Sequence, residues 1–195
     1  DILLASQNFS VEEFVPDRIR IATKLDKPSY KPGETASLDI NAMNFFGPPA
    51  ANRKYETEIQ VKQKTFSPEN YDEYDFNLAN QTSFFDKAVR EGQTNEQGNA
   101  TETYEVEDIY TNKGLLQANF YTTVFDETGR PLSRVSSADI YTQEIFNGIK
   151  YDPYYYYSLN QPIRFELTSV NKNGKPQAST AKVQVVKHEY RTVLK

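Results

Sequence analysis

The residues in this chain that are best suited to chemistry are few and scattered. The 195-residue sequence contains one histidine, His188, and no cysteine. A Ser-His-Asp triad needs a histidine that accepts the proton of the nucleophile, and a zinc site needs three or four ligands at fixed spacing. His188 ends an alternating segment, where a solvated side chain is the simpler interpretation. We therefore predict no catalytic residue, no cofactor site and no metal site, and we predict that the chain is not an enzyme.

One acidic stretch raises the question of calcium binding. It offers four oxygen-bearing side chains, those of Asp72, Glu73, Asp75 and Asn77. The stretch lacks the central glycine and the bidentate glutamate at the twelfth position that an EF-hand loop requires. A solvated acidic loop is the interpretation that we favour, while the sequence alone leaves calcium binding at Asp72–Asn77 open.

Four consecutive tyrosines, Tyr154–Tyr157, form the other conspicuous feature. They could stack against sugar rings or a peptide, which would make the chain an Ig-like adhesion or glycan-binding module. In a strand, however, successive side chains alternate between the two faces, so two of these tyrosines would point inward and pack. The chain has no tryptophan. We keep the glycan-binding module as the alternative function.

Segments that alternate between polar and apolar residues dominate the remaining sequence and predict strands. One-sided alternation means that one sheet face is buried and the other is wet, as in antiparallel β-sandwiches. The clearest predicted strands are Arg18–Leu25, Ala36–Met43, Tyr55–Lys62, Thr101–Glu107 and Gln117–Phe125. Ser83–Arg90 is predicted as a short helix and Thr65–Gln81 as a long irregular excursion. The predicted fold class is all-β.

One turn occurs twice, 127 residues apart. Asn44-Phe-Phe-Gly-Pro-Pro-Ala-Ala51 aligns without a gap with Asn171-Lys-Asn-Gly-Lys-Pro-Gln-Ala178. The copies share the glycine and a proline two places later, but not the two phenylalanines. Glycine permits positive φ and proline fixes the exit of the chain, so the shared part is turn geometry. We interpret Phe45 and Phe46 as packing residues and the repeat as tandem domains of one fold.

Charge and hydropathy exclude two classes of partner. The formal net charge is −5, and no cluster of lysine and arginine is present that could form a face for nucleic acid. No apolar run approaches the roughly 18 to 20 residues that span a bilayer. We predict no nucleic-acid partner and no membrane contact from this segment.

Six short motifs follow one another in an order that is typical of one family. They are Val11-Glu-Glu-Phe-Val-Pro-Asp-Arg-Ile19, Tyr30-Lys-Pro-Gly-Glu34, Phe45-Phe-Gly-Pro-Pro-Ala-Ala51, Thr94–Ala100, Asp126–Ser133 and Phe146–Ile149. Read together, they resemble the middle of bacterial alpha-2-macroglobulins. The first motif is similar to a join between two macroglobulin-like domains of that family, and the third is similar to the turn that follows it. Pro49 departs from the usual form of this turn, and Thr65–Arg90 is particular to this chain.

The resemblance implies tandem macroglobulin-like (Ig-like, fibronectin-like) sandwiches within a large envelope protein that traps proteases. The reactive thioester of the family requires a cysteine, which this chain lacks. The resemblance therefore implies a structural scaffold rather than a reactive site. Its partners would be the neighbouring macroglobulin-like domains and, through the full-length protein, proteases. The implied location is the periplasm or cell envelope, in an exported parent of the lipoprotein type.

The predicted domain organisation has three parts. Residues 1–15 are expected to be the last strand of a preceding macroglobulin-like domain, because Pro16 cannot donate a ladder hydrogen bond and should end it. Residues 16–141 are expected to form a complete macroglobulin-like domain. Residues 142–195 are expected to begin the next one. Three strands are predicted there, at Tyr154–Tyr157, Pro162–Val170 and Ala181–Tyr190, which make at most one sheet of a sandwich.

Overall fold

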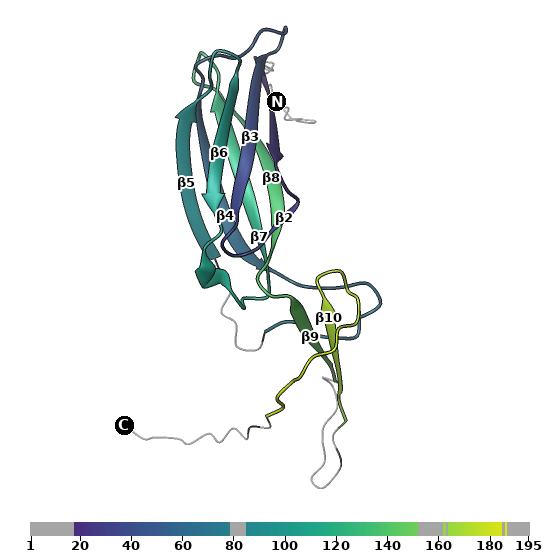
Figure 1. Ribbon diagram of the computed structural model, residues 1–195. Coiled ribbons are helices and arrows are strands. Elements are labelled where there is room, and N and C mark those ends of the chain that lie inside the picture. The colour runs from purple at the N-terminus through teal and green to yellow at the C-terminus, as the bar shows by residue number, and fades with distance from the viewer. Residues whose placement is uncertain (1–17, 79–84, 152–161, 163, 185, 187–195) are drawn as a thin grey trace, which may run out of the picture.

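The computed structural model describes residues 18–78, 85–151, 162, 164–184 and 186. The regular structure in these residues is β-strand apart from one short 3-10 helix, η1, at Asp108–Tyr110 (Figure 1). Within the described ranges, no helix has the length and apolar character needed to cross a bilayer. The predicted all-β class is confirmed. Residues 1–15, the Tyr154–Tyr157 run and His188 lie outside the described residues.

Two sheets pack face to face to form a β-sandwich. The three-stranded sheet has the order β1 (Ile19–Leu25), β3 (Thr35–Asn44) and β6 (Asn99–Glu105). The five-stranded sheet has the order β2 (Ser29–Tyr30), β8 (Pro131–Tyr141), β7 (Leu115–Phe125), β4 (Lys54–Lys64) and β5 (Phe85–Gln93). Neighbouring strands are antiparallel, except that the short β2 runs parallel to β8. The five clearest predicted strands are confirmed as β1, β3, β4, β6 and β7.

The core lies between the sheets because the inward residues of the central strands are apolar. Leu38 and Ile40 of β3 are fully buried against the opposite sheet, where Ile59 of β4 and Phe120 of β7 are register partners. Burying a side chain of this size stabilises the fold by about 1.5–3 kcal/mol. The alternation read from the sequence is therefore the alternation between core and solvent.

The helix predicted at Ser83–Arg90 is wrong, since the described part of this segment belongs to strand β5. Among the described strands, β5 lies at the edge of the sheet and pairs with β4, from Phe85 opposite Lys62 to Gln93 opposite Lys54. Its outward side chains, including Phe85, are exposed. An edge strand with apolar residues on its wet face lacks the clean alternation of a central strand, so pairing with β4 overrides the local pattern.

A separate hairpin follows the sandwich and repeats its turn. β9 (Ile145–Lys150) pairs with β10 (Glu166–Asn171), which lies within the predicted strand Pro162–Val170 except for its last residue. The Asn44 N–H donates to the Pro48 carbonyl at 2.8 Å, and the Asn171 N–H donates to the Lys175 carbonyl at 2.9 Å. The glycine N–H also donates back to the asparagine carbonyl in both copies, at 3.0 and 2.9 Å. The shared turn geometry is confirmed.

Two expectations about side chains and strands are corrected. Phe46 is 94% exposed and Phe45 is 50% exposed, so the interpretation of both as packing residues is wrong. The second copy makes the same turn with Lys172 and Asn173, which shows that the backbone does not need aromatic packing. The strand predicted at Ala181–Tyr190 is absent from its described residues, 181–184 and 186. Within the part of the chain that the structure describes, no strand lies beside these residues to complete a ladder, and alternation alone does not hold a strand.

A carboxylate next to β2 gives the sandwich a pH-dependent contribution to its stability. Asp26 Oδ1 accepts hydrogen bonds from the buried Tyr30 hydroxyl at 2.6 Å and from the Ser37 N–H at 2.8 Å. These bonds, the one from Tyr30 first, lower the pKa of Asp26. Burial and the same bond raise the pKa of Tyr30 to about 12.

We expect Tyr30→Phe to raise the pKa of Asp26 towards its ordinary value. The folded-state pKa of Asp26 lies below its unfolded-state value of about 3.9. The contribution of Asp26 to stability is therefore complete above the unfolded-state pKa and is lost as the pH falls through the folded-state pKa. NMR titration of the carboxyl groups measures the change. Asp126, whose pKa is lowered by bonds within its own turn, is the control that should not move. An unchanged Asp26 titration would show that Tyr30 does not hold the carboxylate.

Candidate functional site

The excursion predicted at Thr65–Gln81 is irregular over its described residues, 65–78, and it lies against the β9–β10 hairpin (Figure 1). It leaves the sandwich at the end of β4 and returns towards β5. It therefore fastens a segment in the middle of the sandwich to a hairpin that follows the sandwich by sequence. We call this contact the junction and regard it as the candidate functional site.

Aromatic side chains form the centre of the junction. Phe66 stacks on Phe146 of β9, with ring centroids 3.9 Å apart and planes 20° apart. Phe76 meets Phe66 edge to face at 5.4 Å. Leu115 of β7 and Val170 of β10 complete the buried cluster. Aromatic pairs of this kind contribute about 0.5–1.5 kcal/mol beyond the area that they bury, so the cluster is a substantial contact.

The backbone of the excursion also bonds to the hairpin. The Asp75 N–H donates to the Ile149 carbonyl at 2.8 Å, and the Ile149 N–H donates to the Asp75 carbonyl at 2.9 Å. Gly148 lets the excursion come this close, because a Cβ at that position would lie 2.6 Å from a ring carbon of Phe76. A glycine within a strand often marks such an approach. The excursion thus adds one bridged residue to the free edge of β9.

Exposed charges surround the aromatic centre. Lys150 Nζ lies 2.7 Å from Glu73 Oε2 and 3.7 Å from Glu166 Oε1, and the Tyr74 hydroxyl donates to Glu166 at 3.0 Å. The hydrogen bond with Glu73 raises the pKa of Lys150. Exposed ion pairs contribute little to stability. These pairs therefore set the alignment of the junction, and the rings supply its strength.

The structure uses the acidic stretch Asp72–Asn77 in this contact and does not gather it around one point. Glu73 pairs with Lys150, and Asp75 Oδ1 accepts the N–H of Asn77 at 2.8 Å. Among the described residues, no group of three or more histidine, cysteine, aspartate or glutamate side chains could hold a metal ion. The sequence reasoning missed the part that Phe66 and Phe76 play, for which Gly148 within a strand was the available signal.

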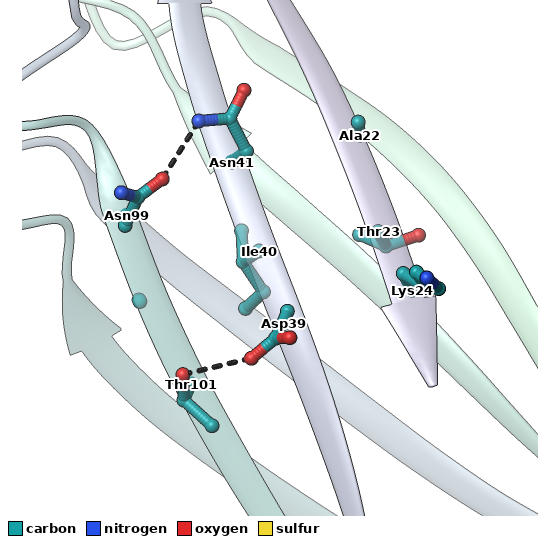
Figure 2. A pocket seen from close by; sticks show the side chains of 9 residues that line it. Ala22, Thr23, Lys24, Asp39, Ile40, Asn41, Asn99 and Thr101 are labelled. Carbon is teal, nitrogen blue, oxygen red and sulfur yellow. Dashed lines mark hydrogen bonds between the residues drawn. The ribbon is translucent and has the colours of Figure 1, made fainter. Parts of the chain in front are cut away.

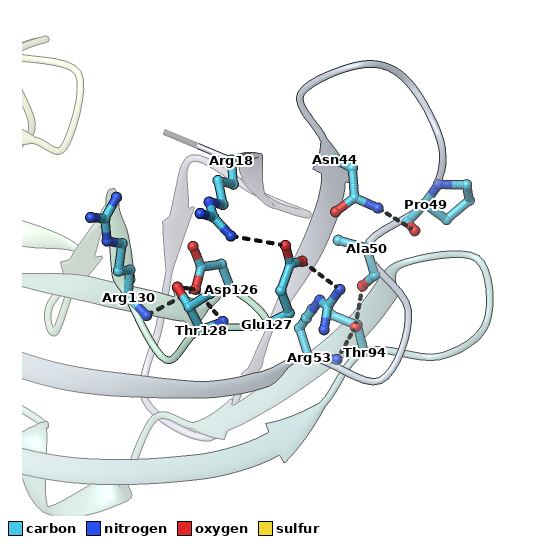
Figure 3. A network of polar contacts seen from close by, with 10 residues as sticks. All are labelled: Arg18, Asn44, Pro49, Ala50, Arg53, Thr94, Asp126, Glu127, Thr128 and Arg130. Carbon is cyan, nitrogen blue, oxygen red and sulfur yellow. Dashed lines mark hydrogen bonds and ion pairs between the residues drawn. The ribbon is translucent and has the colours of Figure 1, made fainter. Parts of the chain in front are cut away.

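The described chain begins at the end of the sandwich away from the β9–β10 hairpin (Figure 1), and a network of polar contacts lies there (Figure 3). Glu127 accepts hydrogen bonds from Arg53 at 3.0 Å and from Arg18 at 3.4 Å. The Thr94 hydroxyl donates to the Ala50 carbonyl at 2.7 Å and accepts the Arg53 N–H at 2.9 Å. These bonds fix three loops and the entry to β1 in one arrangement. The sandwich therefore has an ordered polar end and an aromatic end.

The family of the chain follows from comparison with known proteins. A family model described as the bacterial alpha-2-macroglobulin MG5 domain matches residues 17–141. The chain belongs to the bacterial alpha-2-macroglobulin family. An alpha-2-macroglobulin of Pasteurella multocida (strain Pm70) is 25% identical over 200 residues, which cover 98% of this chain and 10% of that protein. The chain thus spans about a tenth of the length of that alpha-2-macroglobulin.

Solved alpha-2-macroglobulin structures share the fold. The native conformation of the Escherichia coli protein matches 84% of this chain and 11% of its own, with a TM-score of 0.61 and 16% identity. A mutant of Salmonella alpha-2-macroglobulin matches 86% of this chain and 12% of its own, with a TM-score of 0.63 and 17% identity. The excursion lies inside the matched MG5 region and the β9–β10 hairpin lies beyond it. The junction therefore links the alpha-2-macroglobulin MG5 region to the chain that follows it.

Proposed function

We propose that this chain is scaffold within a bacterial alpha-2-macroglobulin that traps proteases, and that the junction passes movement from one domain to the next. The observation that carries this proposal is the buried stack of Phe66 on Phe146. It joins two parts of the chain by packing as well as by covalent connection. A protein that responds to cleavage at one point by moving as a whole needs stiff joints of this kind.

Solved relatives support a response to proteases. Structures of the Escherichia coli protein are described as trypsin activated and as activated by porcine elastase. The full-length protein that contains this chain, which we call the parent, would then be an inhibitor of endopeptidases and not an enzyme. We place it in the periplasm or cell envelope, exported as a lipoprotein. Its proteases would meet the whole parent and not this segment alone.

The proposed domain boundaries follow the prediction from the sequence. Residues 1–15 would end a preceding macroglobulin-like domain, residues 16–141 would form one complete domain and residues 142–195 would begin the next. An exposed apolar pair on the β9–β10 hairpin supports the last boundary, because Ile149 and Leu167 stand opposite each other and remain partly open to solvent. A sandwich needs a second sheet over such a face. The rest of the parent would supply it.

The proposal predicts that the isolated chain inhibits no protease, while the parent requires the junction. Trypsin-like and elastase-like enzymes would be incubated with each protein and assayed on a large protein substrate and on a small peptide substrate. We expect the parent to block digestion of the large substrate and to spare the small one. The parent with Phe66→Ser and Phe146→Ser should be cleaved but should trap poorly.

Phe85→Ser in the parent is the matched control, because Phe85 is 59% exposed on the edge strand and lies outside the junction. It should trap as the unaltered parent does. Stoichiometric protection of large substrates by the isolated chain would overturn the scaffold proposal. Full trapping by the double junction variant would refute the role of the junction in passing movement.

A further inference from the structure

The two hairpins of the chain match strand for strand. Ile19 stands opposite Asn44 in β1–β3, and Ile145 stands opposite Asn171 in β9–β10. With the shared turns superposed, a shift of 126 residues relates β1 to β9 and a shift of 127 relates β3 to β10. On β1, the shift places Arg20, Ala22 and Lys24 at the positions of Phe146, Gly148 and Lys150. On β3, it places Asp39, Asn41 and Met43 at the positions of Glu166, Thr168 and Val170.

In β9–β10, this corresponding face is the one that the excursion covers. Phe146, Gly148 and Val170 are buried beneath the excursion rings, and Lys150 at the far end pairs with Glu73. An irregular segment with two turns, rich in aromatic and acidic residues, thus lies across the face. The contact is an example of a segment held on this face of the hairpin.

In β1–β3, none of the described residues covers the same face, which we call the open groove. Ala22, Lys24, Asp39 and Asn41 are exposed and line a shallow groove of about 390 Å³ on the outside of the three-stranded sheet (Figure 2). The β6 side of the groove is fixed by two bonds: Asn41 Nδ2 donates to Asn99 Oδ1 at 2.7 Å, and the Thr101 hydroxyl donates to Asp39 Oδ1 at 3.0 Å. The β1 side has a small side chain at its centre.

The open groove keeps two features of the covered face and differs in a third. A small residue stands at the centre, Ala22 in place of Gly148. A lysine stands opposite an acid at one end, Lys24 with Asp39 in place of Lys150 with Glu166. At the turn end, Arg20 replaces Phe146 and lies 5.7 Å from the half-exposed ring of Phe45.

We propose that this groove docks an irregular segment of the domain that precedes it in the parent, held as residues 65–78 hold β9–β10. The proposal rests on the proposed function, which supposes such a preceding domain. The segment would carry a carboxylate for Lys24, as Glu73 serves Lys150, and an aromatic ring over Ala22. Because Ala22 has a Cβ where Gly148 has none, that ring would sit farther from the sheet. Arg20 favours acidic or aromatic neighbours at the turn end.

The test compares acylation of lysine amines, read by mass spectrometry, in the 195-residue chain and in the parent. If the docked segment opens about 10% of the time or less, Lys24 should react about tenfold or more slowly in the parent. Lys62, exposed on β4 outside the groove, should react equally in both proteins. Equal reactivity of Lys24 in the two proteins would overturn the proposal, whether or not the parent traps proteases.

A zero-length carbodiimide cross-link identifies the occupant. Lys150 and Glu73 should cross-link in the 195-residue chain, which gives a positive control. In the parent, Lys24 should link to a carboxylate in a segment of the preceding domain that joins two of its strands. A link to residues 1–17 or to a second copy of the parent would contradict the proposal.

A variant that fills the groove completes the test. Ala22→Arg should leave the thermal unfolding of the 195-residue chain unchanged, because Ala22 is exposed. In the parent, it should restore the acylation of Lys24 to the rate seen in the 195-residue chain. Continued shielding of Lys24 in this variant would mean that the groove is not the docking site.

Discussion

Phe146→Ala is expected to release the β9–β10 hairpin while the sandwich stays folded. Phe146 is fully buried and stacks on Phe66, and removing a buried phenylalanine side chain costs about 3–5 kcal/mol. A two-stranded hairpin is marginally stable at best on its own, so the β9–β10 hairpin should unfold when the stack is removed. The core between the sheets does not include Phe146. The loss should therefore be local.

Two-dimensional NMR of the 195-residue chain would measure this result. Amide signals of β9 and β10 should move to random-coil positions, and those of β3, β4 and β7 should stay in place. Phe85→Ala removes an exposed phenylalanine and should change stability by no more than about 0.5 kcal/mol. Native-like β9 and β10 signals in Phe146→Ala would show that the stack does not hold the hairpin.

The second large effect is expected at Gly98, where the chain offers a matched control. Gly98 and Gly129 close turns with the same hydrogen bond. The Gly98 N–H donates to the Asn95 carbonyl at 2.9 Å, and the Gly129 N–H donates to the Asp126 carbonyl at 3.0 Å. Their φ values are +74° and +82°. A Cβ at Gly98 would lie 2.2 Å from the Ala42 carbonyl oxygen, whereas nothing lies within 4 Å of one at Gly129. The two positions differ in steric room and share the backbone conformation.

Gly129→Ala should cost about 1–2 kcal/mol, the penalty of a left-handed conformation for a residue with a Cβ. Gly98→Ala should cost that amount and at least about 2 kcal/mol more, because backbone atoms of β3 must shift to admit the methyl group. Urea unfolding of both variants gives the difference in the free energy of unfolding. Equal losses in the two variants would mean that the contact with the Ala42 carbonyl carries no cost.

The sequence predicted the strands whose inward residues are large and apolar, because burial imposes the alternation that we read. Leu38 and Ile40 in β3 are examples, and both are fully buried. The sequence gives no clear strand signal for β8, since much of its length faces solvent and carries residues such as Ser133 and Arg134. The sequence wrongly favours a helix for β5, because an edge strand with the exposed Phe85 and Val89 does not alternate cleanly.

The candidate functional site could not be predicted from the sequence, for a different reason. Phe66 and Phe146 are 80 residues apart, and the irregular stretch between β4 and β5 gives no period from which a partner could be inferred. The repeated turn was predictable because glycine and proline act on the backbone of their own turn. Which residues share one face of each hairpin follows only from the register of its strands, which the structure shows.

Native-state hydrogen exchange at two amides tests the junction most directly. The Asp75 and Ile149 N–H groups donate to each other's carbonyl oxygens across it, at 2.8 and 2.9 Å. In the 195-residue chain as a dilute monomer, we predict that both amides exchange far more slowly than those of a free peptide. Phe146→Ala should bring both close to the free-peptide rate and leave the β7 amides protected. Exchange of Asp75 and Ile149 at the free-peptide rate in the unaltered chain would contradict the junction.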